Sequence, residues 1–312
     1  MLFDKNKTEL IKYPAGKSLK NFNIPNGVKS LDRYSFCNCS NLTSINIPES
    51  VTYIGIGAFY LCTNLKSIAI PDSVTKIENI TFTGCSSLTS ISIPESVTYI
   101  GLNAFKDCTS LTSIYIPDSV TLTGLSGTFS GCTSLTNVKL PDVIYIISTN
   151  TFAGCSSLLN IIIPDSVTSI KECAFEGCKS LTNIAIPESV TKIGTWAFKD
   201  CTSLKSIAIN NPDCEISNAK DTIPETAVIY GYKNSTAQTY AESFNRKFIS
   251  LEEIGDISGN GEIDLYDAIE IAKAIMGLRT FTAEEMIIAD FNMDGAVDLY
   301  DAIEIARTLL PK

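Results

Sequence analysis

Residues Leu88–Ser110 read LTSISIPESVTYIGLNAFKDCTS, and close copies of this stretch recur along most of the chain. Phenylalanines repeat from Phe36 to Phe198, and cysteines from Cys39 to Cys201, at a period of 23 residues with a single step of 24. A fixed period of this size indicates a solenoid, because each turn can bury its apolar side only against its neighbours. We therefore predict about eight or nine stacked turns.

Within one turn, the segment 88–93 alternates apolar with small polar residues, which predicts a short strand with one buried face. Pro94 ends the strand, and Phe105 with Cys108 would fill the far side of the coil. This pattern resembles the BspA-like class of bacterial leucine-rich repeats over roughly residues 8 to 209. The resemblance implies a leucine-rich-repeat solenoid of short β-strands joined by irregular or short helical turns.

Both ends of the repeat array depart from the pattern. Residues 2–20 resemble an irregular first repeat, and Asn210 replaces the proline where the regular pattern stops. Residues Val228–Leu251 read as strand, turn, helix and strand, which would cover the open edge of the last turn. We expect a solenoid with its N-terminal cap over 1–209 and a C-terminal cap over 210–252.

The nine residues DLYDAIEIA occur twice, at Asp264–Ala272 and Asp298–Ala306, and each copy closes a twelve-residue stretch with calcium-loop spacing. Position 6 is glycine in both loops, Gly261 and Gly295, where a sharp turn needs a permissive φ. Oxygen-bearing side chains fall at positions 1, 3, 5, 9 and 12, and position 7 offers a backbone carbonyl. In the first loop these positions are Asp256, Ser258, Asn260, Glu262 (carbonyl), Asp264 and Asp267; in the second they are Asp290, Asn292, Asp294, Ala296 (carbonyl), Asp298 and Asp301. We predict two calcium ions; the alternative is a pair of acidic, solvated turns before amphipathic helices.

Each loop is followed by one evident helix, and this duplicated unit over 254–312 resembles a type I dockerin. The resemblance implies a small all-α, EF-hand-like module that binds a cohesin on a scaffold protein, as in bacterial cellulosomes for polysaccharide degradation. In that family, loop positions 10 and 11 and exposed positions of the following helix select the cohesin. Here these positions are Leu265, Tyr266, Ala272, Lys273, Leu299, Tyr300, Ala306 and Arg307.

The Leu-Tyr pairs at positions 10 and 11 depart from the small hydroxyl residues of many dockerins, so the cohesin subtype stays open. The pairs could belong to the module's core, but a calcium ligand fixes the neighbouring backbone and would make them rigid anchors for a partner. Because both copies carry the same residues, we also expect two alternative binding orientations.

Eight of the eleven cysteines share one phase, which favours buried free thiols as small apolar fillers. Cys37, Cys173 and Cys214 lie outside this ladder and could pair or stay free. Histidine is absent, which excludes Ser-His-Asp and Cys-His nucleophilic machinery. Acidic residues in the repeats recur directly after the proline. A charge at the same position on every turn is typical of a solvent-exposed row rather than of a catalytic pair. We predict no catalytic residues, with an enzyme attached through the dockerin as an alternative.

A net charge of −10 and a pI near 4.7 argue against nucleic acid binding. No run of eighteen apolar residues exists, so we expect no membrane span. The N-terminal MLFDKNKTEL is too polar for a signal peptide. Both resemblances imply export, so we expect a secreted, extracellular protein of a cell-surface complex, whose signal peptide is not in this chain.

One column of strand-face residues is small on most turns but carries Tyr115, Lys139 and Ile162 near the inserted residue. We take these three residues as a hypothetical contact patch for an unknown protein or polysaccharide; the alternative is neutral surface drift. The whole pattern predicts a non-catalytic cellulosomal component with a calcium-loaded, cohesin-binding dockerin. A calcium-dependent sensor without a cohesin is the remaining alternative.

Overall fold

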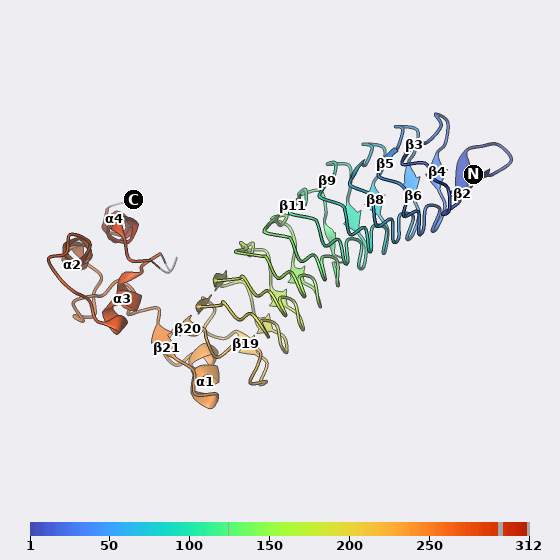
Figure 1. The fold of residues 1–312 in the computed structure, drawn as a ribbon. Helices are drawn as coiled ribbons and strands as arrows, with labels where there is room; N and C mark the ends of the chain where they lie inside the picture. The colour runs from blue at the N-terminus through green and yellow to red at the C-terminus, as the bar shows by residue number, and fades with distance from the viewer. Residues whose placement is uncertain (124, 293–295, 311–312) are drawn as a thin grey trace. The chain divides into compact units, whose positions relative to one another are not determined.

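The computed structural model describes residues 1–123, 125–292 and 296–310 (Figure 1). The described chain forms two compact units. The first comprises 1–181, 187–203 and 215–224; the second comprises 182–186, 204–214 and 225–312. Among the described residues, every helix is too short or too polar to cross a lipid bilayer.

The first unit is a coil of short parallel strands, as the 23-residue period predicts. One series of strands lines one side of the coil, and a second series lines another. The first series is β3 (Asn21–Asn23), β5 (Ser44–Asn46), β7 (Ser67–Ala69), β9 (Ser90–Ser92), β11 (Ser113–Tyr115) and β13 (Asn137–Lys139). The second series is β4 (Ser30–Leu31), β6 (Tyr53–Ile54), β8 (Lys76–Ile77), β10 (Tyr99–Ile100), β12 (Leu122–Thr123), β14 (Ile146–Ile147), β15 (Ser169–Ile170), β17 (Lys192–Ile193) and β19 (Glu215–Ile216).

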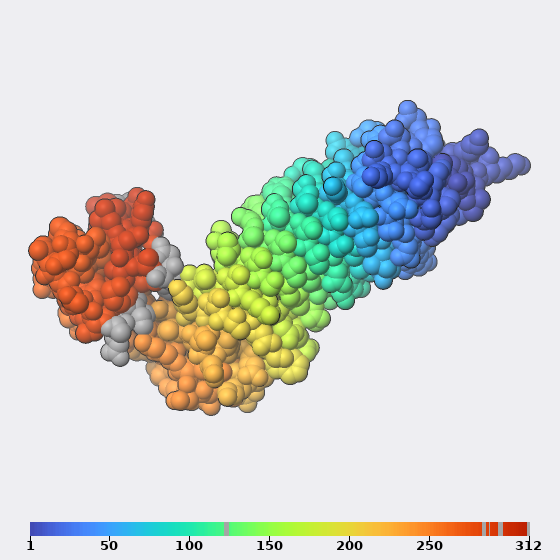
Figure 2. Space-filling view, in the orientation of Figure 1, coloured from blue at the N-terminus to red at the C-terminus, as the bar shows by residue number. Residues whose placement is uncertain are grey.

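Register between turns follows directly from the repeat. Ser67 in β7 pairs with Ser90 in β9, and Ile68 pairs with Ile91, so each residue lies beside its counterpart one period away. Identical side chains therefore stack in columns along the first unit. In Figure 2 successive turns of this unit, blue to yellow, pack directly against one another.

The N-terminal edge of the first unit is covered by a hairpin. Strand β1 (Leu2–Phe3) pairs antiparallel with β2 (Glu9–Lys12), which pairs in parallel with β4. The hairpin thus occupies hydrogen-bonding groups that an open sheet edge would expose.

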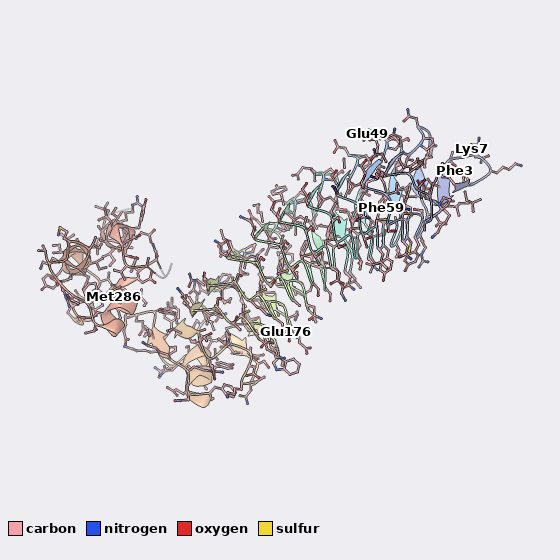
Figure 3. The ribbon with its side chains drawn as sticks, in the orientation of Figure 1. Phe3, Lys7, Glu49, Phe59, Glu176 and Met286 are labelled. Atoms are coloured by element: carbon pink, nitrogen blue, oxygen red, sulfur yellow. The ribbon has the colours of Figure 1, made fainter. Side chains whose placement is uncertain are left out.

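A ladder of phenylalanines fills the interior of the coil. All eight, from Phe36 to Phe198, have no exposed surface, and Figure 3 shows Phe59 inside the turns. Neighbouring rings are stacked with centroids 5.3–5.8 Å apart, within the favourable range for aromatic pairs. The repeated apolar residues therefore make one continuous core.

The cysteine ladder lies beside the phenylalanines, and none of the eleven cysteines, all of them described, is joined in a disulfide. From Cys62 to Cys201, each ladder thiol donates a hydrogen bond of 3.1–3.3 Å to the carbonyl of a phenylalanine on the preceding turn. Burial raises the pKa of Cys85 to about 12. The thiol therefore stays protonated at neutral pH and acts as a packing group rather than a nucleophile.

The second unit contains a parallel sheet of β16 (Asn183–Ile186), β18 (Ser206–Ile209), β20 (Val228–Gly231) and β21 (Phe248–Ser250). Helix α1 (Thr236–Ser243) separates β20 from β21, the strand, helix and strand order that the sequence predicts. Ser235 caps α1 by accepting the N–H of Gln238. Figure 1 shows α1 next to these two strands.

Three further helices complete the second unit: α2 (Leu265–Ile275), α3 (Ala283–Ala289) and α4 (Leu299–Thr308). Their core consists of Ile257, Ala268, Ile271, Ala289, Ala302 and Ile305. Helix α3 is a departure from the sequence analysis, which found only the helices that follow the loops. It was missed because it is short and not duplicated; Thr282 and Glu285 form the capping box that begins it.

The stacked core generates a stability prediction. Replacing Phe82 by alanine (Phe82→Ala) removes a ring that contacts rings on both sides, so we expect a loss of about 3–5 kcal/mol in the free energy of unfolding. Guanidinium unfolding followed by circular dichroism measures it. The matched control is Ser90→Ala on the exposed strand face, which should change stability by less than about 0.5 kcal/mol. Equal effects of the two substitutions would contradict the stacked core.

Candidate functional site

The first of the two duplicated loops winds around the carboxylate of Asp256. This carboxylate accepts hydrogen bonds from the backbone N–H of Asn260 (3.1 Å) and of Gly261 (2.8 Å), and from the hydroxyl of Ser258 (3.1 Å). Gly261 has a φ of +88°, a conformation that L side chains rarely adopt. The glycine at loop position 6 thus allows the backbone to turn back toward Asp256.

Two more aspartates close this loop onto α2. Asp264 is the N-cap of α2 and accepts the N–H of Tyr266 at 2.7 Å. Asp267 is fully buried and accepts the N–H of Ser258 (2.9 Å) and that of Asp264 (2.8 Å). The start of the loop and the first turn of the helix are therefore joined by one carboxylate.

The second loop repeats this closure. Asp301 is fully buried and accepts the N–H of Asn292 (3.1 Å) and of Asp298 (2.8 Å). Asp298 caps α4 and accepts the N–H of Tyr300 at 2.7 Å. Asp290 is nearly buried and Ala296 is exposed, whereas Asp294 and Gly295 lie outside the described residues.

The oxygen donors of the first loop suit a hard cation. Asp256, Asp264 and Asp267 supply carboxylates, while Ser258 and Asn260 supply a hydroxyl and an amide, the mixed donor set that calcium accepts. Among the described residues, no three acidic, histidine or cysteine side chains already converge as a metal cluster. The calcium-binding role of these particular residues remains a prediction.

The Leu-Tyr pairs at positions 10 and 11 of the two loops are exposed, so they do not belong to the module's core. The exposed fractions are 59% for Leu265, 54% for Tyr266, 57% for Leu299 and 68% for Tyr300. Each pair directly follows the aspartate that caps its helix, so its backbone is fixed by the capping box. Further along the helices, Ala272, Lys273 and Ala306 are half-buried, and Arg307 is exposed.

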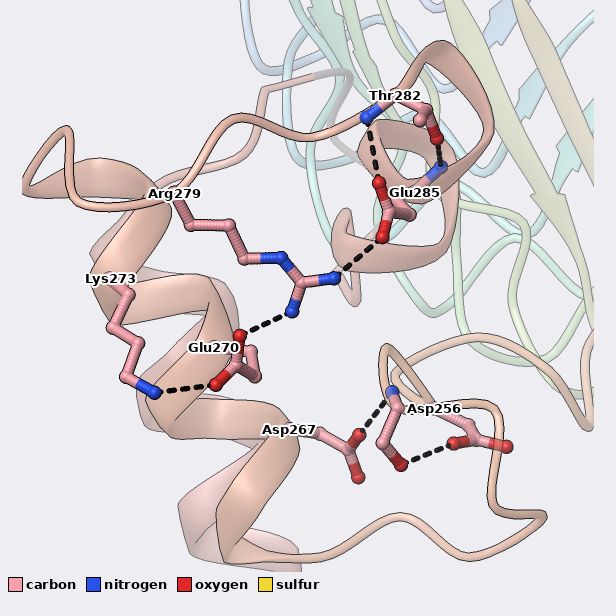
Figure 4. A network of polar contacts seen from close by, with 8 residues as sticks. Asp256, Asp267, Glu270, Lys273, Arg279, Thr282 and Glu285 are labelled. Carbon is pink, nitrogen blue, oxygen red and sulfur yellow. Dashed lines mark hydrogen bonds and ion pairs between the residues drawn. The ribbon is translucent and has the colours of Figure 1, made fainter.

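A charge network joins α2 to the segment before α3 (Figure 4). The Glu270 carboxylate, on a nearly buried side chain, bonds Lys273 at 2.7 Å and also contacts Arg279, which bonds Glu285 at 2.6 Å. The ammonium of Lys273 lies over the Tyr266 ring, 5.7 Å from its centroid. Lys273 and Arg279 lower the pKa of Glu270 below its ordinary value by bonding its charged form.

The second half lacks this network among the described residues. Glu304 and Arg307 occupy the positions equivalent to Glu270 and Lys273, but neither makes an ion pair there. The sequence analysis missed the difference because Arg279 lies outside the duplicated nine residues. Only the path of the chain after α2 brings this arginine back to Glu270.

Comparison with known proteins identifies both parts. The signature of the BspA type leucine rich repeat region matches residues 13–126 and 123–220 in six copies, and that of the dockerin type I domain matches 254–310. The chain belongs to the BspA type leucine-rich-repeat family. It also carries a type I dockerin, as the sequence resemblance predicts. No curated protein shows significant similarity to the whole chain.

Solved bacterial structures are similar to this BspA-type chain. A leucine-rich repeat protein from Bacteroides ovatus is 29% identical, with a TM-score of 0.59, over 78% of this chain and 73% of its own. A T. pallidum leucine-rich repeat protein is 27% identical, with a TM-score of 0.49, over 65% of this chain and 86% of its own. A leucine-rich repeat protein from Eubacterium ventriosum is 32% identical, with a TM-score of 0.42, over 64% of this chain and 47% of its own.

These assignments limit the function of the two parts. Type I dockerins are calcium-binding modules that bind cohesins. Leucine-rich repeats and dockerins are non-catalytic modules, and both are typical of extracellular proteins. The dockerin is thus a binding module whose exposed surface carries the candidate partner residues.

The charge network predicts a pH-dependent contribution to dockerin stability. Because the folded-state pKa of Glu270 is lowered, its stabilising contribution is present above the unfolded-state pKa and disappears as the pH falls through the folded-state pKa. We expect Glu270→Gln to lower the thermal midpoint of the dockerin at pH 7 but to match the original protein at strongly acidic pH. Glu304→Gln is the matched control and should change the midpoint little at either pH. A Glu270→Gln effect that persists unchanged in acid would contradict this role.

Proposed function

We propose that this protein is a non-catalytic component of an extracellular, cellulosome-type complex. Its calcium-loaded dockerin binds a cohesin on a scaffold protein, and its repeats display a second interaction surface. The observation that carries the proposal is the pair of exposed Leu-Tyr anchors, each fixed directly after an aspartate that caps its helix.

Calcium binding would act on these anchors through the aspartates that cap the two helices. Asp264 and Asp298 are proposed ligands at loop position 9, and each also holds the first turn of its helix through a capping hydrogen bond. A bound ion would fix these aspartates and, through them, the backbone of the following Leu-Tyr pair. Exposed tyrosines often contribute strongly to protein binding, and holding them on a rigid backbone reduces the conformational entropy lost on binding.

We further propose that two ions bind, one in each loop, and that both halves can face the cohesin. Leu265 and Tyr266 present nearly the same exposed side chains as Leu299 and Tyr300. The two faces differ in charge pairing, because Lys273 is bound to Glu270 whereas Arg307 makes no ion pair among the described residues. The orientation that uses Arg307 therefore has a cation ready for a carboxylate on the partner.

The first experiment is calorimetric titration of the protein against a panel of cohesins, with calcium and with chelator. We expect tight binding to at least one cohesin in calcium and its loss in chelator, because the anchors depend on the loops. Binding that ignores the chelator would exclude the calcium dependence. The absence of binding to every cohesin would favour a calcium sensor without a cohesin.

The two-orientation hypothesis makes a separate prediction about single and double substitutions. Removing one anchor leaves the other face intact, so Tyr266→Ala or Tyr300→Ala alone should weaken binding by only about twofold if the faces are equivalent. The double substitution should weaken it at least about tenfold. Abolition by Tyr266→Ala alone, with no effect of Tyr300→Ala, would leave a single binding face. Circular dichroism in calcium is the folding control.

The two loops should also differ in calcium affinity. The first has three carboxylates among its proposed side-chain ligands and the second has four, and ligand charge tunes affinity. In calorimetric calcium titrations, Asp256→Ala disables the first loop and should leave the tighter, second site. Asp290→Ala disables the second loop and should leave the weaker, first site. Equal affinities of the two variants would contradict this order.

A further inference from the structure

Three bulky residues interrupt an otherwise small-residue column on the strand face of the first unit. The equivalent residues on earlier turns are Asn46, Ala69 and Ser92. Tyr115 on β11 and Lys139 on β13 lie in register, and Ile162 follows one period later. The exposed fractions are 48% for Tyr115 and 88% for Ile162. Other turns have Ala or Ser at this position, so the fold does not require large side chains in this column.

A hollow lies at the same place. Its volume is about 350 Å³, and Asn137, Lys139, Asp142, Asn160 and Ile162 contribute to its lining. Residues 160–163 are in phase with β13, yet they form no strand, although all four are described. A second hollow on the same face is lined by small residues such as Ser44, Ser67 and Ser90 together with buried isoleucines. The two hollows differ in lining: only the one at Ile162 combines a large exposed apolar side chain with charged groups.

The charge at this hollow is negative. Lys139 lies 3.5 Å from Asp118 and 4.0 Å from Asp142, and its ammonium is 5.6 Å from the centre of the Tyr115 ring. Asp118 also accepts the backbone N–H of Asp142 at 3.0 Å. Lys139 is the single cation between residues 108 and 170, where Asp165 adds a third carboxylate. Asp142 lines the hollow, and Asp118 and Asp165 hold the same repeat position on the two adjacent turns, so three carboxylates and one ammonium make this part of the strand face complementary to a cation.

We propose that Tyr115, Lys139, Ile162 and this hollow form a docking surface for a protein segment. The segment would carry an aliphatic or aromatic side chain beside a lysine or arginine. Ile162 and Tyr115 offer the apolar contact, since an exposed apolar group that the fold does not need gains free energy when a partner covers it. The carboxylates of Asp142 and Asp165 favour the basic residue. A neutral polysaccharide has no cation to pair with these carboxylates and no aliphatic side chain to cover Ile162.

The test uses a random twelve-residue peptide library displayed on phage, selected on the intact protein. The comparison variant carries Tyr115→Ser, Lys139→Ser and Ile162→Ser together, which restores the small residues of neighbouring turns and so should preserve the fold. The matched control carries Asn46→Ala and Ser92→Ala in the same column. Circular dichroism and thermal unfolding check all three proteins.

We expect enriched peptides that pair an apolar residue with lysine or arginine. Their synthetic forms should bind the triple variant at least about tenfold more weakly than the control, as measured by fluorescence anisotropy. Asp142→Asn should also weaken binding, and the difference should shrink in 1 M salt. No enrichment, equal binding to the triple variant, or enrichment of acidic peptides would overturn the proposal. If the protein binds cellohexaose or xylohexaose and the triple variant does not, the ligand of this surface is a polysaccharide, and the proposal of a protein segment is wrong.

Discussion

The burial of one apolar face by the next turn is the constraint on which the first unit depends. A single 23-residue turn exposes its leucines, isoleucines and phenylalanine, and only a neighbour of the same shape can cover them. Stacked rings such as Phe59 on Phe82 therefore join adjacent turns, and the cysteines fill the space beside them. The in-register pairing of strands follows from the same requirement.

This architecture separates stability from recognition. Inward positions are mostly apolar, and the column beside the phenylalanines admits only small residues such as Ala58 and Thr81, because a change on one turn is felt by both neighbours. Outward side chains on the strands face solvent and do not have to fit between neighbouring turns. The column that contains Ala69 and Ser92 can therefore also contain Tyr115 and Ile162. Function on the repeats is therefore expected where outward residues depart from the repeat, and not where they follow it.

The dockerin differs from the repeats because few core residues must stabilise both the module and its exposed Leu-Tyr pairs. Its apolar core is small, and the buried Asp267 and Asp301 link each loop to its helix through backbone hydrogen bonds. The same local geometry leaves the Leu-Tyr pairs exposed beside the capping aspartates. In the first half, Glu270 and Arg279 add a charge network that the second half does not have among the described residues.

The sequence by itself determined the repeat period, the stacked core, the two loops and the family of each part. These features follow from short sequence patterns. The repeat period, the proline position and the loop spacing each recur several times in the chain, so they can be recognised without the structure. Tertiary structure alone decided the burial of Glu270 and its contact with Arg279. Each of these depends on where a distant or unrepeated segment returns in space. Glu270 and Glu304 lie in the same duplicated nine residues, but only Glu270 is followed by a segment whose arginine, Arg279, folds back onto it.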